Sequence, residues 1–241
     1  MKKSIKILLT LLMVIVFLAA GVVAWQYDNI TALINGLNNS TEDLAVKIDD
    51  HRNKVQTEVK KYVPEAIEDI SAEDEQKLLK GEMNIDEIAE KYNLPIEYMK
   101  DEEVVIPEKG PDAIIVSEDI QSDNIKKIEK EIGDSVARMY ALKAKYVNKL
   151  GELEREVIKE YSNLPKSKQN SEGKKELVMS NINYVAKLEK TCDTEVDKVV
   201  FSLEKNLKEL GGDLEIIQVL KKAYTDEKEL KKSYYLSMYN E

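Results

Sequence analysis

Two short runs of carboxylates are the residues of this chain whose chemistry could serve acid–base catalysis or divalent-cation binding. They are Glu73-Asp74-Glu75 and Asp101-Glu102-Glu103. Adjacent carboxylates can share a proton or ligate Ca²⁺, but a dedicated calcium loop also needs glycine and regularly spaced ligands, which neither run has. The first run follows Ser71 and fits the first turn of a helix, where negative charge is favourable. We therefore interpret both runs as solvated charges at helix ends or in loops.

His51 and Cys192 are the only histidine and the only cysteine. One histidine excludes a two-histidine metal site within a chain. His51 lies between Ile48 and Val55 at helical spacing, which indicates a partly buried interface position, with pH sensing as the alternative. Cys192 lies on an apolar stripe and is interpreted as a packed side chain, with an intermolecular disulfide as the alternative. No nucleophile, zinc-protease or phosphate-loop motif occurs, so we predict no catalytic residue, metal or cofactor and no enzyme.

A basic segment stands out in an otherwise acidic chain. Its lysines are Lys166, Lys168, Lys174 and Lys175, in the connection between two long helical patterns. The simpler interpretation is a solvated loop. The functional interpretation is a partner contact at the end of a helical arm about 60 Å long, suited to an anionic polymer or an acidic partner.

The chain's N-terminal region contains a run without charge, from Ile7 to Trp25. As a helix this run would be roughly 28 Å long, close to the thickness of a bilayer's hydrocarbon core. Lys2, Lys3 and Lys6 precede it and no positive charge follows before Lys47, so we expect a cytoplasmic N-terminus and an extracytoplasmic remainder. A cleaved signal peptide is the alternative, because small residues precede possible cleavage points at Ala19-Ala20-Gly21 and Val22-Val23-Ala24.

The composition indicates an acidic, helical, exported body. The formal net charge of −10 becomes −13 for the remainder once the three N-terminal lysines are assigned to the cytoplasm. Such a surface on average repels nucleic-acid phosphates and anionic headgroups, so neither nucleic acid nor broad binding to a membrane surface is expected. The chain is 34% charged and has only two Phe and one Trp, which favours long helices over sheets.

We predict an all-α fold in five parts: a cytoplasmic stub (1–6), a transmembrane anchor (7–25), a helical stalk (26–63), short helices with a possible small hairpin (64–120), and a long antiparallel helical hairpin with C-terminal helices (121–241). In the stalk, Leu44, Ile48, His51 and Val55 form one seam. The pattern at 36–40 allows either a break, with a helix start at Ser40-x-x-Asp43, or a continuous rod.

The middle part is expected to contain helices at Ala72–Lys80, capped by Ser71, at Ile85–Tyr92, capped by Asn84, and from Pro95 to Met99. Two β-branched runs, 104–106 and 114–116, would form a small hairpin or a tether.

The three-four spacing of apolar residues predicts a helix of roughly 40 residues from Asp123 to Tyr161 and a second arm ending at Gly211-Gly212. The arms should pack as a hairpin. Asp213 would cap the next helix, with Leu214, Ile217 and Leu220 on its apolar side, and a last helix would run from Thr225 to Tyr239, its tyrosines docked on the hairpin.

One segment resembles a LysM module, the peptidoglycan- and chitin-binding unit in which two helices pack on a small sheet. The likeness lies in Lys80-Gly81, Ile85, Ile88-Ala89, Lys91-Tyr92, Leu94, Met99 and Val105-Ile106-Pro107. Gly81 is followed by Glu82-Met83 rather than Asp-Thr, and the Asn expected after the second helix is missing, so no sugar-binding residue is carried over.

These features predict a membrane-anchored extracytoplasmic helical interaction or scaffold protein of the cell envelope that is not catalytic. Its expected partners are the membrane, through a single span, and an envelope protein or a second copy of itself. The alternative is a cell-wall protein that binds peptidoglycan through residues 80–107.

Overall fold

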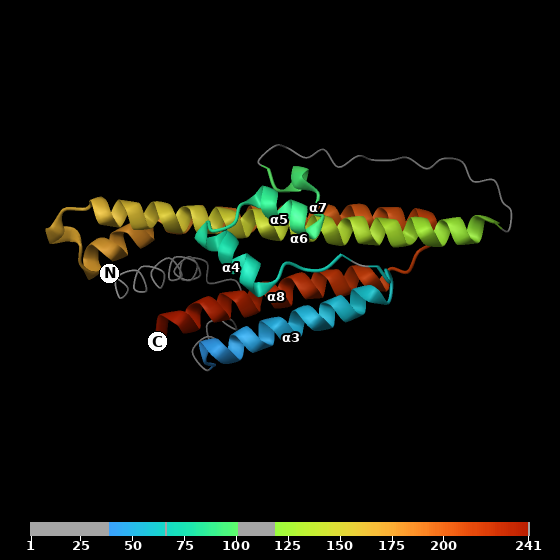
Figure 1. Ribbon diagram of the computed structural model, residues 1–241, viewed down its shortest axis with the longest axis horizontal. Helices are drawn as coiled ribbons and strands as arrows, with labels where there is room; N and C mark the ends of the chain where they lie inside the picture. Colours follow the sequence, from blue (N-terminus) through green and yellow to red (C-terminus); the bar gives the residue numbers. More distant parts are fainter. Residues whose placement is uncertain (1–38, 66, 101–118, 241) are drawn as a thin grey trace. The chain divides into compact units, whose positions relative to one another are not determined.

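The computed structural model describes residues 39–65, 67–100 and 119–240, and it is all-α, with no strand among these residues. The helices are α3 (Thr41–Lys60), α4 (Ala72–Lys80), α5 (Ile85–Tyr92), α6 (Asp119–Asn163), α7 (Ser171–Leu210) and α8 (Glu215–Asn240), with short 3₁₀ turns η1 (Ile96–Tyr98) and η2 (Lys166–Lys168) (Figure 1). No helix among the described residues has the length and apolarity needed to cross a membrane. The apolar run Ile7–Trp25 lies outside them, as do the β-branched runs at 104–106 and 114–116 and the carboxylates 101–103.

The chain divides into two compact units, to which α3, α6, α7 and α8 all contribute. Unit 1 consists of Met1–Arg52, Lys149–Thr191 and Tyr224–Glu241, and unit 2 consists of Asn53–Asn148 and Cys192–Ala223. Each unit has its own apolar core. Leu44, Leu153, Val157 and Val185 are buried in unit 1, and Leu78, Ile88, Ile132, Leu203, Leu207 and Ile216 are buried in unit 2.

Helix α3 begins where the sequence places a cap. The Ser40 hydroxyl accepts a hydrogen bond from the Asp43 backbone N–H at 3.1 Å, and no helix runs through residues 39 and 40. The predicted helix start is therefore confirmed, and the continuous rod is wrong at these two residues, because the Ser40 side chain caps the first turn. Leu44, Ile48 and Val59 are buried and Val55 is half-buried, so the predicted seam faces inward.

The middle helices α4 and α5 have the predicted bounds, because their caps are local. Ser71 accepts from the Asp74 N–H, and Gly81, with φ 72°, ends α4. Asn84 and Glu87 form a capping box that starts α5, and Asn93, with φ 50°, ends it. After Pro95 the chain forms the 3₁₀ turn η1, somewhat shorter than the predicted third helix. The two helices and η1 pack through buried Leu78, Leu79, Ile88, Leu94 and Met99.

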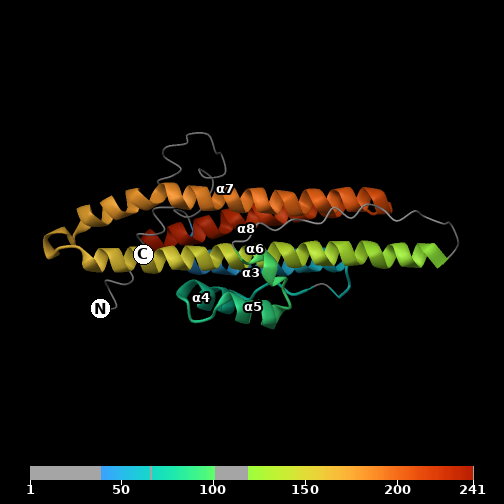
Figure 2. The ribbon, with the colours of Figure 1, turned by 90° about the horizontal axis from the view of Figure 1, so that it is seen from above.

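Helices α6 and α7, of 45 and 40 residues, are the two longest elements. Within unit 2 they run antiparallel, because Lys145 pairs with Glu195 and Glu131 pairs with Asn206. Within unit 1 they are joined by the loop of residues 164–170. Both helices extend from this loop in the same direction (Figure 2).

The C-terminal region is one helix rather than the two we predicted. Helix α8 is continuous from Glu215 to Asn240, because neither glycine nor proline interrupts it. The Asp213 carboxylate accepts from the Glu215 N–H at 2.8 Å, as predicted. The predicted apolar side was partly wrong: Leu214 precedes the helix and is exposed, whereas Ile216 is fully buried beside Ile217 and Leu220.

Candidate functional site

Of the predicted basic segment, Lys166 and Lys168 lie in the loop between α6 and α7 in unit 1, whereas Lys174 and Lys175 lie near the start of α7. Lys166 and Lys168 lie in η2, and both are exposed. The loop is held by local hydrogen bonds: the Gln169 side chain donates to the Leu164 carbonyl at 2.8 Å and to the Ser162 carbonyl at 3.2 Å. These hydrogen bonds fix the conformation of the backbone that carries the lysines.

The N-terminus of α7 is capped within the loop. The side-chain oxygen of Asn170 (Oδ1) accepts from the backbone N–H groups of Glu172 at 2.9 Å and Gly173 at 3.1 Å. A Cβ at Gly173 would lie 2.0 Å from the Lys168 carbonyl oxygen, so only glycine fits there. Because the first amides of α7 already have an acceptor, any attraction for an anion must come from the lysine side chains.

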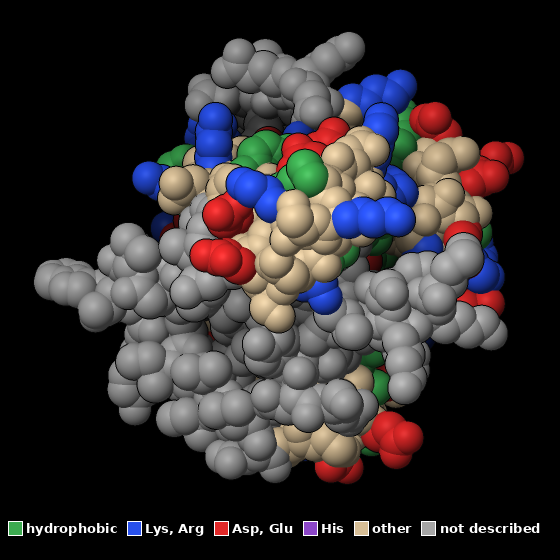
Figure 3. Space-filling model, turned by 90° about the vertical axis from the view of Figure 1, so that its left-hand side faces the viewer, with side chains coloured by type: hydrophobic (Ala, Val, Ile, Leu, Met, Phe, Trp, Pro, Cys, Tyr) green, Lys and Arg blue, Asp and Glu red, His purple; other side chains and the backbone are tan. Residues whose placement is uncertain are grey.

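The remaining lysines of the segment differ in their surroundings. Lys174 is half-buried with its ammonium 5.5 Å from the ring centroid of Tyr161, a cation–π contact. Lys168 lies 3.7 Å from Glu176, and both of these side chains are more than half exposed, so this pair is weak. The side chain of Lys175 lies outside the described set. Figure 3 views this end, where lysine and carboxylate side chains lie side by side (Figure 3).

The carboxylates Asp74 and Glu75 are not solvated, contrary to our interpretation. Asp74 is 2% exposed and Glu75 is 6% exposed, whereas the side chain of Glu73 is open and pairs with Lys77. The Asp74 carboxylate accepts from the Lys91 ammonium at 2.5 Å and from the Tyr92 hydroxyl at 2.6 Å. Both donors lie at the end of α5, so the reason for the burial is a partner 17 residues away in the chain.

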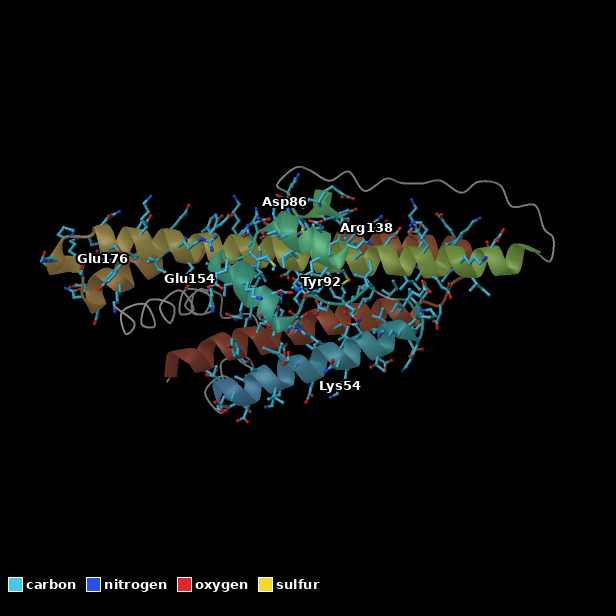
Figure 4. All side chains as sticks on the ribbon, viewed as in Figure 1. Lys54, Asp86, Tyr92, Arg138, Glu154 and Glu176 are labelled. Carbon is cyan, nitrogen blue, oxygen red and sulfur yellow. The ribbon has the colours of Figure 1, made fainter. Side chains whose placement is uncertain are left out.

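The hydrogen bonds from Lys91 and Tyr92 lower the pKa of Asp74 from 3.8 to about 2, despite the opposing effect of burial. The same hydrogen bond raises the pKa of Lys91. Asp74 is thus ionised throughout the physiological range and cannot serve as a proton donor there. Tyr92 also accepts from the Ser71 N–H at 3.0 Å, so this cluster ties the start of α4 to the end of α5 (Figure 4).

A second buried charge joins this part of unit 2 to α6. The Lys143 ammonium donates to both carboxylate oxygens of Asp69, at 2.8 and 3.0 Å, and lies 3.7 Å from Glu75. Nearby, the Arg138 guanidinium lies over the ring of Tyr98 at 5.5 Å, and burial raises the pKa of that tyrosine. Lysine and arginine of α6 therefore hold the 69–98 segment by charge as well as by apolar contact.

The pairing of α6 with α7 also includes a buried charge. The Lys145 ammonium lies 3.1 Å from each carboxylate oxygen of Glu195 and is 5% exposed. Further toward the start of α6, the Asn206 amide donates to Glu131 at 2.8 Å. Such cross-helix pairs contribute little net stability but disfavour other registers, since a one-turn slip would leave a buried ammonium without its carboxylate.

In unit 1 the corresponding role belongs to Glu189 of α7. Its carboxylate accepts from Lys232 and lies 3.3 Å from Lys228, both on α8. Helix α8 in turn contacts α3, through Thr41 and Ser237 at 3.0 Å and through Arg52 and Glu227 at 3.8 Å. These pairs show that α3 and α8 run antiparallel.

His51 and Cys192 are both half-buried, as expected for positions on helix seams. Among the described residues, no group of three or more His, Cys, Asp and Glu side chains could hold a metal ion. The buried carboxylates of Asp74 and Glu75 instead meet the ammonium groups of Lys91 and Lys143, and Asp74 also meets the Tyr92 hydroxyl. The basic loop belongs to unit 1 and the Asp74 cluster belongs to unit 2.

Comparison of the chain with protein-family models, with curated proteins and with solved structures gave no match. The resemblance to LysM therefore stays one of short motifs. The structure also differs from that of a LysM module. The residues that lead into Gly81 form helix α4, whereas the small sheet would need a strand there.

Sequence reasoning missed the buried charges of α6. Lys143 and Lys145 lie in a segment of α6 whose remaining residues are nearly all buried. These include Ala141, Leu142, Ala144 and Tyr146. A lysine surrounded by apolar residues on both sides was the available signal, since such a residue must be paired when its helix is buried all round.

Proposed function

We propose that this protein is a single-span, membrane-anchored helical scaffold of the cell envelope, whose extracytoplasmic body binds another envelope protein or a second copy of itself. The proposal is supported by the uncharged run Ile7–Trp25 behind three lysines and by the acidic, all-α chain that follows. It assigns no catalytic step to the chain.

The interaction role is supported by the contacts that α6 and α7 make and by the exposed side chains of α7. In unit 2, Lys145 of α6 pairs with Glu195 of α7 and Lys143 of α6 pairs with Asp69, so the register of α6 against its neighbours is fixed there. The outward face of α7 carries large apolar side chains as well as charges: Phe201 is 71% exposed in unit 2 and Tyr184 is 47% exposed in unit 1. Rigid helix faces with exposed aromatic anchors are a common means of protein recognition.

The test is photo-crosslinking in the intact membrane. A photoreactive amino acid replaces Phe201 in one version of the full-length chain and Tyr184 in another, and Asp86, exposed on α5, is the matched control position. Two differently tagged copies are expressed together. We expect a discrete protein adduct from an α7 position and none from Asp86. An adduct carrying both tags identifies self-association, and the absence of any adduct from α7 would contradict the proposal.

The glycan-binding alternative is tested with the same full-length protein. If residues 80–107 act as a LysM-like module, the detergent-solubilised chain should co-sediment with purified peptidoglycan. The interaction proposal predicts that it stays in the supernatant, because helix α4 stands where the small sheet of a LysM module would need a strand.

A further inference from the structure

The α6–α7 loop is the strongest candidate for a further contact, because positive charge is concentrated there in a chain of formal charge −10. Lys166, Lys168, Lys174 and Lys175 lie within ten residues, with Glu172 and Glu176 as the nearby carboxylates. The capped start of α7 and the hydrogen-bonded turn make this a preformed basic surface, with its two η2 lysines exposed. This charge suits an anionic partner.

The position of the loop within unit 1 indicates which anionic surface it meets. Helix α3 starts at Thr41 and contacts α8 near its end, at Ser237. Helix α8 contacts α7 at Glu189, through Lys228 and Lys232. Figures 1 and 2 both show the loop continuing past the start of α3 and the end of α8 (Figures 1 and 2).

The helix rise gives the length of this overhang. From Glu189 to the start of α7 at Ser171 is about 27 Å of helix, and from Lys232 to Ser237 is about 7 Å. The loop therefore lies roughly 20 Å beyond Thr41. It points in the direction from which the chain enters α3.

The length of chain between the apolar run and α3 matches this overhang. Residues 26–40 separate Trp25 from Thr41. A chain of this length spans about 22 Å at the rise of a helix and about 50 Å when fully extended. A bilayer holding Ile7–Trp25 is thus within reach of the loop, and the anchor raises the effective concentration of its headgroups so that a weak contact suffices.

We propose that the α6–α7 loop binds the anionic lipid headgroups of the same bilayer that holds the N-terminal anchor. The inference rests on the proposed single span. Lysine ammonium groups are attracted to an anionic headgroup layer within a Debye length of about 10 Å, and Lys166 and Lys168 are the exposed donors for it. The contact would set the angle between unit 1 and the membrane. This angle would depend on salt concentration and lipid charge.

The experiment uses the full-length chain reconstituted into vesicles, with Cys192→Ala and Ser167→Cys carrying an environment-sensitive fluorophore in the loop. We expect loop emission to increase about twofold when neutral phosphatidylcholine vesicles are replaced by vesicles containing phosphatidylglycerol, and to fall back at high salt. Glutamine at positions 166, 168, 174 and 175 should abolish the increase.

The matched control changes four exposed lysines of unit 2, Lys54, Lys126, Lys127 and Lys198, to glutamine. This variant carries the same charge change and should keep the lipid response. Anchoring is scored in the same samples by flotation after an alkaline wash. The loop contact alone is overturned if the protein floats but its loop emission does not change with lipid charge, or changes equally in both quadruple variants. The anchor is overturned if the protein fails to float.

Discussion

At the scale of single residues, the buried Asp74 and the part-buried Lys143 of unit 2 each meet an opposite charge. Asp74 is held by Lys91 and Tyr92, and Lys143 by Asp69. When one partner of such a pair is removed, the remaining charge stays in the buried site and keeps its desolvation penalty. The loss of folding stability is then larger than the stability that the intact pair contributes.

Replacement of Asp74 by asparagine should lower the free energy of unfolding by about 1–3 kcal/mol, because the exposed Lys91 ammonium and the half-buried Tyr92 hydroxyl lose the ionised acceptor that Asp74 provides. The measurement is urea unfolding of the full-length chain in detergent, followed by circular dichroism, with amide hydrogen exchange at α4. Asp86→Asn is the control: Asp86 is exposed in the first turn of α5, so its loss should cost at most about 0.5 kcal/mol. Equal effects of the two substitutions would show that the Asp74 cluster does not stabilise unit 2.

The pKa of Asp74 predicts a dependence of stability on pH. Its pKa is lower in the folded chain, about 2, than its ordinary value of 3.8, so its contribution is fully present above about pH 4 and is lost as pH falls toward 2. The depression corresponds to about 2 kcal/mol. Urea titrations at pH 5 and pH 2.5 should therefore show a steeper loss for the unmodified chain than for Asp74→Asn. Parallel losses in the two proteins would contradict the assignment.

At the scale of elements, caps and glycines decide where each helix begins and ends. Gly211, with φ 70°, ends α7, and the Gly212 N–H donates to the Leu207 carbonyl at 2.8 Å. Asn170 and Gly173 shape the start of α7 in the same way. Register between helices is then fixed by the cross-helix pairs, Lys145 with Glu195 in unit 2 and Lys232 with Glu189 in unit 1.

One substitution should have opposite effects at two helical glycines. Gly133→Ala in α6 places its Cβ 3.7 Å from Val63, an ordinary contact, and should raise the free energy of unfolding by about 0.5–1 kcal/mol because alanine favours a helix. Gly173→Ala places its Cβ 2.0 Å from a backbone oxygen and should open the loop.

Hydrogen exchange of the full-length chain measures both effects. We expect slower exchange around residue 133 in the first variant and faster exchange across residues 165–175 in the second. Unchanged protection of the loop in Gly173→Ala would show that the turn at Lys168 is not as tight as the structure indicates.

At the scale of the whole molecule, the distribution of charge along the chain separates a basic N-terminal end from an acidic remainder. Three lysines precede Ile7, and the part after Trp25 has a formal charge of −13 once they are set apart. This asymmetry is what the positive-inside rule uses to orient a single span. It also makes the lysines of the α6–α7 loop an exception within the acidic remainder.

The proposed topology predicts the behaviour of reporters at the C-terminus. A reporter active only outside the cytoplasm should be active there, and one active only in the cytoplasm should be silent. N-terminal sequencing of the membrane-bound protein should begin at or near Met1, because the apolar run exceeds the usual length of a signal h-region. A new N-terminus near residue 22 or 25 would show cleavage, and activity of the cytoplasmic reporter would place the body on the other side.

The sequence alone determined the helical class, the bounds and caps of α4 and α5, and the two long arms that meet at residues 164–170. These features depend on contacts within a few residues, such as Ser71 with Asp74 or Asn84 with Glu87, which local patterns encode directly. The basic loop was also evident, because its lysines are neighbours in the chain.

Only the tertiary structure decided which charges are buried and which apolar residues are not. Asp74 appeared to be a solvated first-turn charge because its donors, Lys91 and Tyr92, come from another helix. Lys145 meets a carboxylate 50 residues away, and Leu214 lies exposed where Ile216 is buried. Burial is set by what packs against a residue from distant segments, and no pattern within one helix contains that information.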